Sequence, residues 1–192
     1  VYKRQVMHWL KGNSFDRTIA LWREHDALRA ALSDLPRCLC HHDAFKRNLL
    51  FAPNEDGGEE IIAIDWAFIG HGVLGEELAA TVGAALMFRD VDAGQAEALS
   101  ECVFKAYLDG LRASGWSGST RDVRLGFTAT TALMFGVGAL GPWLPLLRDP
   151  QYEPVVRAIT GVSTDELTDT LAAIQPFFLD LGEEALQLAS VG

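Results

Sequence analysis

The segment LCHHDAFKRNLLFA, residues 39–52, places histidine, acidic, basic and amide side chains directly before an apolar run. That run is followed by PNEDGGEE (53–60) and then by a second apolar run, IIAIDW (61–66). Pro, Asn, Asp and Gly are the residues that form turns, and both apolar runs have the length of strands. The sequence therefore predicts a β-hairpin over residues 48–66.

The register of this hairpin decides which polar residues meet at its open end. If the turn centres between Asp56 and Gly57, Asn48 faces Asp65, with Cα atoms roughly 4.5–5.5 Å apart. Asp43 lies in the loop that leads into the first strand. A separator of eight residues leaves the register open by a residue or two. With that margin, one asparagine and two carboxylates are expected to converge at one point.

The rest of the chain is predicted to be mostly helical, which gives an α+β fold class. A helix is expected over residues 16–32, ended by Pro36, and residues 67–75 are expected to form a glycine-rich loop. Further helices are predicted by apolar periodicity and by glycine and proline punctuation, near 76–88, 94–113, 120–139, 152–159 and 164–188.

Composition limits the classes of partner. The chain has 192 residues, of which 49% are hydrophobic, enough for one compact unit. Its formal net charge of −10 argues against a nucleic-acid partner and is compatible with a cationic ligand, although acidic chains are common. No uninterrupted apolar run of roughly 18 residues and no signal peptide is visible, so no membrane partner and a cytoplasmic location are expected. Three cysteines do not make a disulfide framework.

The polar cluster suits phosphoryl transfer. Mg²⁺ prefers oxygen ligands and is usually held by one or two carboxylates together with substrate phosphates. A further carboxylate can orient an acceptor hydroxyl and take its proton. These parts match the kinase pattern H-x-D-x-x-x-x-N followed by a metal-binding Asp.

At these positions the sequence resembles a known family. HHDAFKRN (41–48) fits the pattern, and IAIDWAFIGHGVLGEELA (62–79) is similar to the corresponding segment of the aminoglycoside phosphotransferase family, a kinase-like group that includes choline kinases. The resemblance implies that Asp43 is the catalytic base, that Asn48 and Asp65 hold Mg²⁺, and that ATP is the phosphate donor. It also implies that His41 packs against and braces the loop of residues 41–48, called the motif loop below.

Four further residues are assigned supporting roles. His42 stands where many relatives have Gly, and Glu77 stands where many have the Asp of a D-L-A triplet and is expected to brace the motif loop. Lys46 lies inside the motif. His71 lies close to Asp65 in sequence. Two interpretations of His71 are equally weighted: it contacts the substrate, or it has no role in the site.

A second difference from the family is one of extent. Relatives have an N-terminal lobe that binds the nucleotide, whereas the 40 residues before His41 have a helical pattern. The chain is therefore interpreted as the C-terminal lobe of a kinase-like fold, with the nucleotide lobe missing. Residues 1–38 would form leading helices, 39–75 the motif loop and hairpin, and 76–192 a helical substrate-side bundle.

The predicted function is transfer of the ATP γ-phosphate to a hydroxyl of a small molecule resembling an aminoglycoside, amino alcohol or sugar, by a lobe inactive on its own. Ala67 stands where choline kinases typically carry an acidic residue, which lowers the expectation of a choline-type substrate. Only ten residues separate Asp65 from Glu76, too few for the long activation segment that supports a peptide substrate.

Several alternatives stay open. The chain could be a non-catalytic binding or regulatory module that kept the fold. A metal-dependent hydrolase would use His41, His42, Asp43 and Asp65. A zinc site at Cys38, Cys40, His41 and His42 is disfavoured because its spacing is too compressed. GVGALG (136–141) matches a phosphate-loop pattern, but no strand is expected before it and no helix after it, so a packed helix end is the preferred interpretation.

Overall fold

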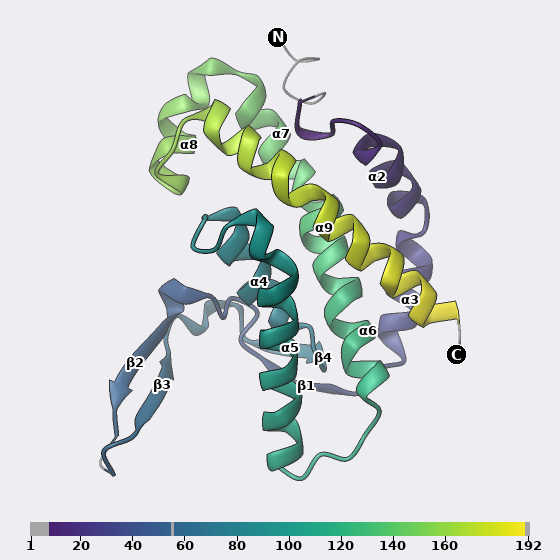
Figure 1. Ribbon diagram of the computed structural model, residues 1–192, viewed down its shortest axis with the longest axis vertical. Coiled ribbons are helices and arrows are strands. Elements are labelled where there is room, and N and C mark those ends of the chain that lie inside the picture. The colour runs from purple at the N-terminus through teal and green to yellow at the C-terminus, as the bar shows by residue number, and fades with distance from the viewer. Residues whose placement is uncertain (1–7, 55, 191–192) are drawn as a thin grey trace.

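The computed structural model describes residues 8–54 and 56–190. In this part of the chain most residues are helical, and the strands form two small antiparallel sheets of two strands each (Figure 1). The expected α+β class with a predominance of helix is confirmed.

The predicted hairpin is confirmed as β2 (Leu49–Pro53) and β3 (Glu59–Ala63). It projects away from the helical body (Figure 1). Its register, however, differs from the expected one by one residue. Leu49 pairs with Ala63, and the backbone N–H of Ile64 donates to the carbonyl of Asn48 at 2.9 Å, so Asn48 faces Ile64 and not Asp65.

The turn explains this register. The N–H of Asn54 donates to the carbonyl of Gly58 at 2.9 Å, and the N–H of Gly58 donates to Asn54 Oδ1 at 2.6 Å. The asparagine side chain thus closes the turn on itself, as this residue type often does. The turn consequently centres on Asp56, half a residue earlier than expected, and Asp65 follows directly after the partner of Asn48.

The second sheet was not expected. It pairs β1 (Arg37–Cys40) with β4 (Gly70–Val73), so residues 67–75 are not simply a glycine-rich loop and the leading segment does not stay helical up to residue 38. Two glycines lie in β4, at positions where a side chain would meet its neighbours. A Cβ on Gly72 would lie 2.7 Å from His42 Nε2 and 2.8 Å from Cys40 Sγ.

Most of the predicted helices are confirmed. The helical pattern expected over 16–32 is confirmed, but the chain breaks at Glu24, so this segment forms two helices and not one. The helices are α2 (Ser14–Arg23), α3 (His25–Ser33), α4 (Glu77–Met87), α5 (Ala96–Ala113), α6 (Thr120–Thr131), α8 (Glu153–Thr160) and α9 (Thr164–Ser190). The expectation that residues 1–7 belong to the leading helices lies outside the described residues.

The segment GVGALG is not followed by a break, contrary to expectation. A π-helical stretch (Ala132–Gly138) continues α6 and leads into α7 (Leu140–Arg148). Pro142 lies in the first turn of α7, where a missing backbone N–H costs little, while Pro145 is inside the helix. Because the backbone is helical on both sides of the glycines, this segment is not a phosphate-binding loop.

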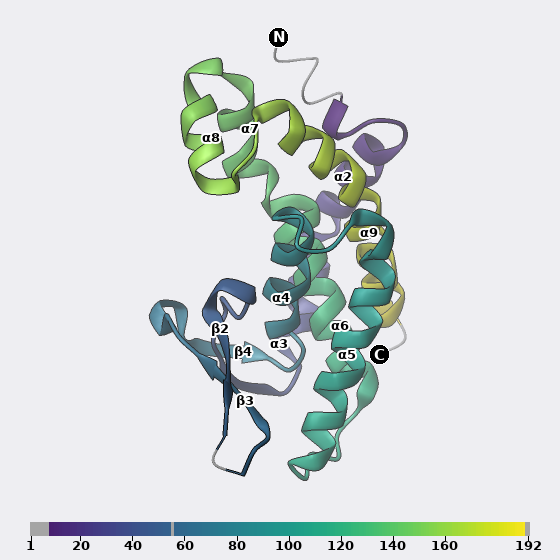
Figure 2. The same ribbon diagram turned by 60° about the vertical axis from the view of Figure 1, so that its left-hand side comes forward.

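The core lies where α9 crosses α6, and it supports α4 (Figures 1 and 2). Leu78, Val82 and Leu86 of α4 are buried in it at a spacing of four residues. That spacing defines one face of a helix. Glu77 and Thr81, also four residues apart, share a different face, which meets the motif loop.

One continuous helical run, Thr120–Arg148, is long and apolar enough by composition to cross a membrane. In the structure, 67% of its most apolar window is buried among the other helices. Core helices of globular proteins pass the same length and composition test, so this single helix is weak evidence for a membrane span.

Candidate active site at the motif loop

Asp43 and Asn48 are in direct contact, as the motif spacing suggested. The Asn48 amide nitrogen donates to Asp43 Oδ2 at 2.8 Å and to the Asp43 backbone carbonyl at 3.0 Å. Asn48 is 8% exposed and is fixed at the end of a short 3₁₀ turn (Lys46–Asn48). Because its amide nitrogen is used in this way, Asn48 Oδ1 is left to act as an oxygen ligand.

Asp65 lies one residue beyond the hairpin pair of Asn48 and Ile64. Its side chain is exposed and accepts no hydrogen bond from the described residues, and its backbone has a φ of 59°. This left-handed conformation is uncommon for residues other than glycine, and such strained residues cluster at functional sites. Asp65 thus presents a free carboxylate near the open end of the hairpin.

His41 links the two sides of this arrangement. Its Nδ1 accepts the backbone N–H of Asp43 at 3.3 Å, so the proton belongs on Nε2, which donates to the carbonyl of Ile64 at 2.8 Å. The ring is 4% exposed and packs against Trp66 at a centroid distance of 4.5 Å. Both nitrogens of His41 are therefore engaged, which leaves none for a metal.

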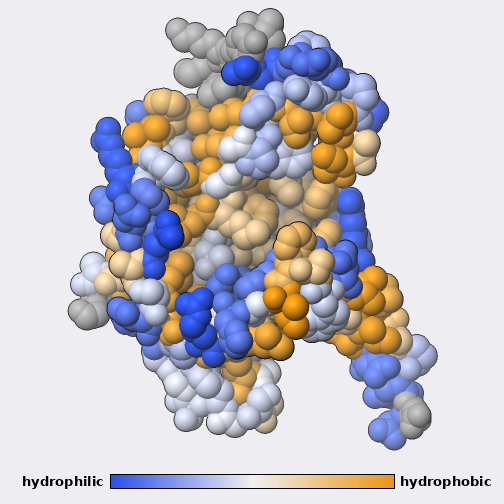
Figure 3. Space-filling model, turned by 180° about the vertical axis from the view of Figure 1, so that it is seen from behind, coloured by the Kyte–Doolittle hydropathy of each residue, from blue (hydrophilic) through white to orange (hydrophobic). Residues whose placement is uncertain are grey.

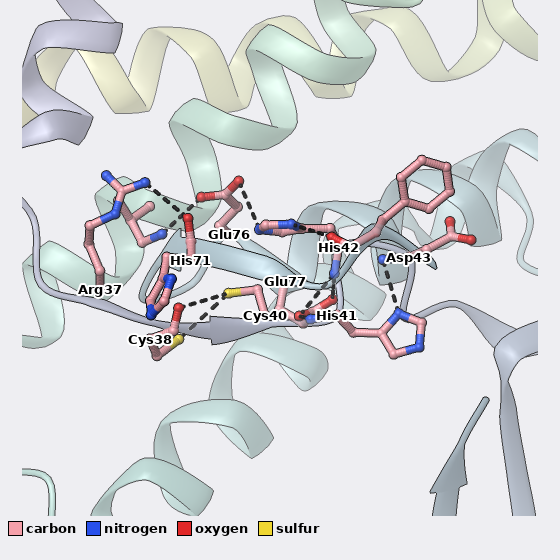
Figure 4. A network of polar contacts seen from close by, with 11 residues as sticks. Arg37, Cys38, Cys40, His41, His42, Asp43, His71, Glu76 and Glu77 are labelled. Carbon is pink, nitrogen blue, oxygen red and sulfur yellow. Dashed lines mark hydrogen bonds and ion pairs between the residues drawn. The ribbon is translucent and has the colours of Figure 1, made fainter. Parts of the chain in front are cut away.

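His42 adopts a φ of 64°, which accounts for the glycine that many relatives have at this position. Its Nδ1 lies 3.0 Å from the carbonyl of Phe68, and Nε2 lies 3.5 Å from Glu76 Oε1 (Figure 4). Glu76 also accepts the backbone N–H of Val73 at 2.9 Å. The His42 side chain thereby connects the motif loop to the segment that follows Asp65.

Glu77 accepts the backbone N–H groups of two consecutive loop residues. Its carboxylate lies 2.5 Å from the nitrogen of His41 and 3.0 Å from that of His42. One turn further along α4, Thr81 Oγ1 donates to the carbonyl of Ala44 at 2.6 Å. The motif loop is thus held by α4 at three backbone positions, and Thr81 is a contact that sequence reasoning missed although its i, i+4 spacing from Glu77 indicates it.

Lys46 and His71 lie at the periphery of the site. Lys46 Nζ pairs with Asp90 at 2.7 Å and its side chain is 71% exposed, so it anchors the loop to the segment after α4. His71 pairs with Leu39 across β1 and β4, and its side chain lies on the side of that sheet opposite His42 (Figure 4). Phe88 is a further contact of the motif loop that the sequence did not predict. Its ring stacks with that of Phe45 and lies 4.3 Å from the guanidinium carbon of Arg47.

The cysteines do not form a metal-binding site. Cys38 and Cys40 lie two residues apart on β1, with sulfur atoms 3.6 Å apart. Burial, followed by the hydrogen bond with Cys38, raises the pKa of the Cys40 thiol to about 12, so it remains protonated at neutral pH and is a poor ligand. Within residues 8–54 and 56–190, no three His, Cys, Asp or Glu side chains are placed to hold a metal ion together. The zinc and hydrolase alternatives are therefore not favoured.

The contact between Glu77 and the loop predicts a loss of stability. Glu77→Ala leaves two amide groups of the motif loop without their acceptor, and each unmet buried donor costs roughly 1–3 kcal/mol. We expect the free energy of unfolding, measured by urea denaturation, to fall by about 2–3 kcal/mol.

The matched control is Asp165→Ala, which also removes an acidic side chain from the first turn of a helix, here α9. Asp165 is exposed and its side chain makes no hydrogen bond or ion pair with the described residues, so the main loss is the interaction with the helix dipole, worth at most about 1 kcal/mol. Equal losses in the two variants would show that Glu77 does not brace the loop.

Comparison with known proteins agrees with the site. A family model described as the phosphotransferase enzyme family (APH) matches residues 2–114, more than half of the chain and including the whole motif loop and hairpin. No curated protein and no solved structure gives a match. On the family match, this chain belongs to the phosphotransferase enzyme family.

Proposed function

We propose that this chain carries the catalytic lobe of an ATP- and Mg²⁺-dependent kinase that phosphorylates a hydroxyl of a small molecule. The observation that carries the proposal is the contact of Asp43 with Asn48, with Asp65 directly beyond the hairpin residue that pairs with Asn48. The family match supports phosphotransfer in general. The acceptor class, the nucleotide and the role of each residue belong to the proposal.

Asp43 acts as the base in this proposal. One carboxylate oxygen receives the hydrogen bond from Asn48, and the other has no donor among the described residues. The free oxygen accepts the proton of the acceptor hydroxyl as that oxygen attacks phosphorus. The hydrogen bond from Asn48 fixes the rotation of the carboxylate, so the acceptor is oriented before the reaction begins.

The donor set at the open end of the hairpin fits a hard cation. Asn48 Oδ1 and the exposed Asp65 carboxylate are oxygen donors that receive no hydrogen bond from the described residues. When bound, Mg²⁺ would neutralise charge on the nucleotide phosphates. His41, which contacts both Asp43 and Ile64, keeps the base and the Asp65 carboxylate in a fixed relation.

The nucleotide-binding lobe is proposed to cover the hairpin. Large apolar side chains on the hairpin and on the segment after it are open to solvent, with Phe51 exposed by 72% and Ile61 by 62%. The other large apolar side chains exposed there are Leu50, Ile62, Ile64, Trp66, Phe68 and Ile69. The side seen in Figure 3 has apolar surface over the hairpin. Patches of this kind on soluble proteins usually mark contact surfaces. A lobe that closed over them would also bring a nucleotide to the end of the hairpin where Asn48 and Asp65 lie.

A small acceptor suits the shape of the molecule. The space-filling view shows a hollow with an apolar floor, between the base of the hairpin and the part of the helical body drawn at the top of the view (Figure 3). The helical body resumes at Glu77, so no long segment after Asp65 is available to support a peptide. Three acidic residues of α9 that could attract a cationic acceptor are engaged in ion pairs. Asp180 and Glu183 pair with Arg17, and Glu184 pairs with Arg124.

The proposal is tested by acceptor-dependent release of ADP. The native polypeptide that contains residues 1–192 is incubated with Mg²⁺·ATP and a panel of amino sugars, amino alcohols and sugars. We expect one acceptor class to raise ADP release well above the rate without acceptor. Nucleotide binding without turnover on any acceptor would contradict the assigned acceptor classes. The absence of both turnover and nucleotide binding would overturn the kinase and favour a non-catalytic binding module.

A further inference from the structure

A cleft formed by three helices lies away from the motif loop. It has a volume of about 250 Å³ and is lined by residues of α5, α6 and α9. The motif loop packs on α4 through Glu77 and Thr81, and α4 lies between the hairpin and α5 (Figure 2). Since ligand pockets for drug-sized molecules start near 300 Å³, this cleft suits a compact ligand.

The rim of the cleft carries more acidic groups than its own arginine neutralises. Arg124 pairs with Glu184 at 2.6 Å and with Glu101 at 2.9 Å. Asp180, a third acidic residue of the rim, pairs with Arg17 at 2.6 Å. Glu97, the fourth, makes no ion pair with any residue in 8–54 or 56–190. The cleft therefore lacks a positive charge beside Glu97.

A buried hydroxyl beside Glu97 also lacks a partner. Ser100 is 2% exposed and lines the cleft, and its Oγ makes no hydrogen bond with the described residues. Buried polar atoms without a partner are rare in folded proteins. Ser100 follows Glu97 by three positions on α5, so the two side chains lie on the same face of that helix. An exposed carboxylate and a buried hydroxyl without a partner thus lie one helical turn apart in the lining of the cleft.

The remaining walls are apolar. Phe177 and Leu181 of α9 line the cleft together with these polar groups. An aromatic ring attracts cations through its face, and a leucine side chain packs well against methylene groups. The combination of carboxylate, hydroxyl, ring and alkyl wall is the chemistry that recognises an alkylammonium group.

We propose that the cleft between α5, α6 and α9 binds a compact organic cation through a primary ammonium group. The ammonium donates to the Glu97 carboxylate and to Ser100 Oγ, and its alkyl chain packs against Phe177. This site is separate from the proposed transfer of phosphate, because α4 lies between it and the motif loop. Its test therefore uses equilibrium binding and does not depend on turnover.

The probe is 1,4-diaminobutane, with 1,4-butanediol as the uncharged match of equal length. Isothermal titration calorimetry at about 0.15 M ionic strength, where long-range charge effects are screened, is expected to show saturable binding of one diamine per chain and none of the diol. No saturable binding of the diamine up to about 10 mM would overturn the proposal, because a Kd above the millimolar range means only a few kcal/mol of affinity.

Two variants locate the site. Glu97→Gln removes the charge and is expected to raise the Kd of the diamine about 10-fold or more, and Ser100→Ala about 3-fold or more, since hydrogen bonds to a charged group are the stronger kind. Glu60→Gln, an equal loss of charge on the hairpin, serves as the control and should leave the Kd unchanged. Ser100 Oγ has no hydrogen-bond partner in the described part of the chain, so Ser100→Ala is expected to unfold at the same temperature as the parent.

A fourth variant separates this cleft from the active site. Asp43→Asn is expected to bind the diamine as the parent does. If Asp43→Asn lost binding, or if Glu97→Gln and Ser100→Ala bound as tightly as the parent, the diamine would be bound elsewhere and the proposed site would be wrong.

Discussion

Asp43→Asn is expected to lower kcat for acceptor-dependent ADP release by about 10²–10⁴-fold, the range that general base catalysis contributes. The substitution keeps the shape of the side chain and leaves an oxygen that can accept the hydrogen bond from Asn48. What is lost is the ability to take the acceptor proton. The free energy of unfolding should stay within about 0.5 kcal/mol of the parent value, as for a substitution that breaks no buried contact.

The control for this variant is Asp56→Asn, the same chemical change in the exposed turn of the hairpin. It should leave kcat unchanged. The affinity for Mg²⁺·ADP, measured by calorimetry, is expected to be similar in Asp43→Asn and in the parent, because the metal is assigned to Asn48 and Asp65. A variant that retains parental kcat would remove Asp43 from the role of base. A loss of kcat that merely parallels a loss of stability would do the same.

The motif loop and hairpin could be predicted because their signals are local. The turn residues between the two apolar runs are adjacent in sequence, and the contact of Asp43 with Asn48 spans only five positions. The register was missed by one residue because it depends on a side-chain hydrogen bond inside the turn, from the N–H of Gly58 to Asn54 Oδ1. Apolar alternation alone does not specify which residues close a turn of this length.

The elements that were missed depend on distant contacts. β1 and β4 are short, and β4 contains two glycines, so neither segment has the pattern of a strand. They are strands because they pair with one another across some 30 intervening positions of the chain. α7 was missed because prolines usually end helices, whereas here the preceding π-helical turns continue into α7 with Pro142 in its first turn.

The supporting residues show the same division between local and distant information. The motif places His41 and Glu77 in the site, but it does not reveal that His41 bonds to Ile64 or that Glu77 accepts two successive backbone N–H groups. The contacts of Glu77 depend on the first turn of α4 lying beside the motif loop. The position of α4 is in turn set by the short connection Leu74–Gly75, which packs against α6.

That connection makes Gly126→Ala the substitution with the largest expected effect on stability. In the interior of a helix, replacing Gly by Ala normally stabilises by about 1 kcal/mol. At Gly126 of α6, however, a Cβ would lie 2.1 Å from the carbonyl oxygen of Leu74 and 3.2 Å from Val73 Cγ2. The nearest atom belongs to the backbone, so it cannot rotate away, and either α6 or the connection must move.

Overpacking of this kind costs about 1–3 kcal/mol and sometimes more, so the steric cost exceeds the gain in helix propensity. We expect Gly126→Ala to lower the free energy of unfolding by about 3 kcal/mol in urea denaturation. A displaced connection would also shift Glu77 away from the motif loop, so kcat should fall in the fraction that remains folded. A mutant protein as stable as the parent would show that the close approach of α6 to Leu74 does not exist in solution.

Gly110→Ala is expected to change the free energy of unfolding in the opposite direction. Gly110 is exposed on α5, and a Cβ there would have no atom within 4 Å. Only helix propensity is at issue, so the substitution should stabilise the fold by about 0.5–1 kcal/mol. Two identical changes in two helices, one destabilising and one stabilising, would establish that the contact of α6 with the segment before α4 decides the outcome. A fall in kcat confined to Gly126→Ala would then connect that contact, through Glu77, to the geometry of the motif loop.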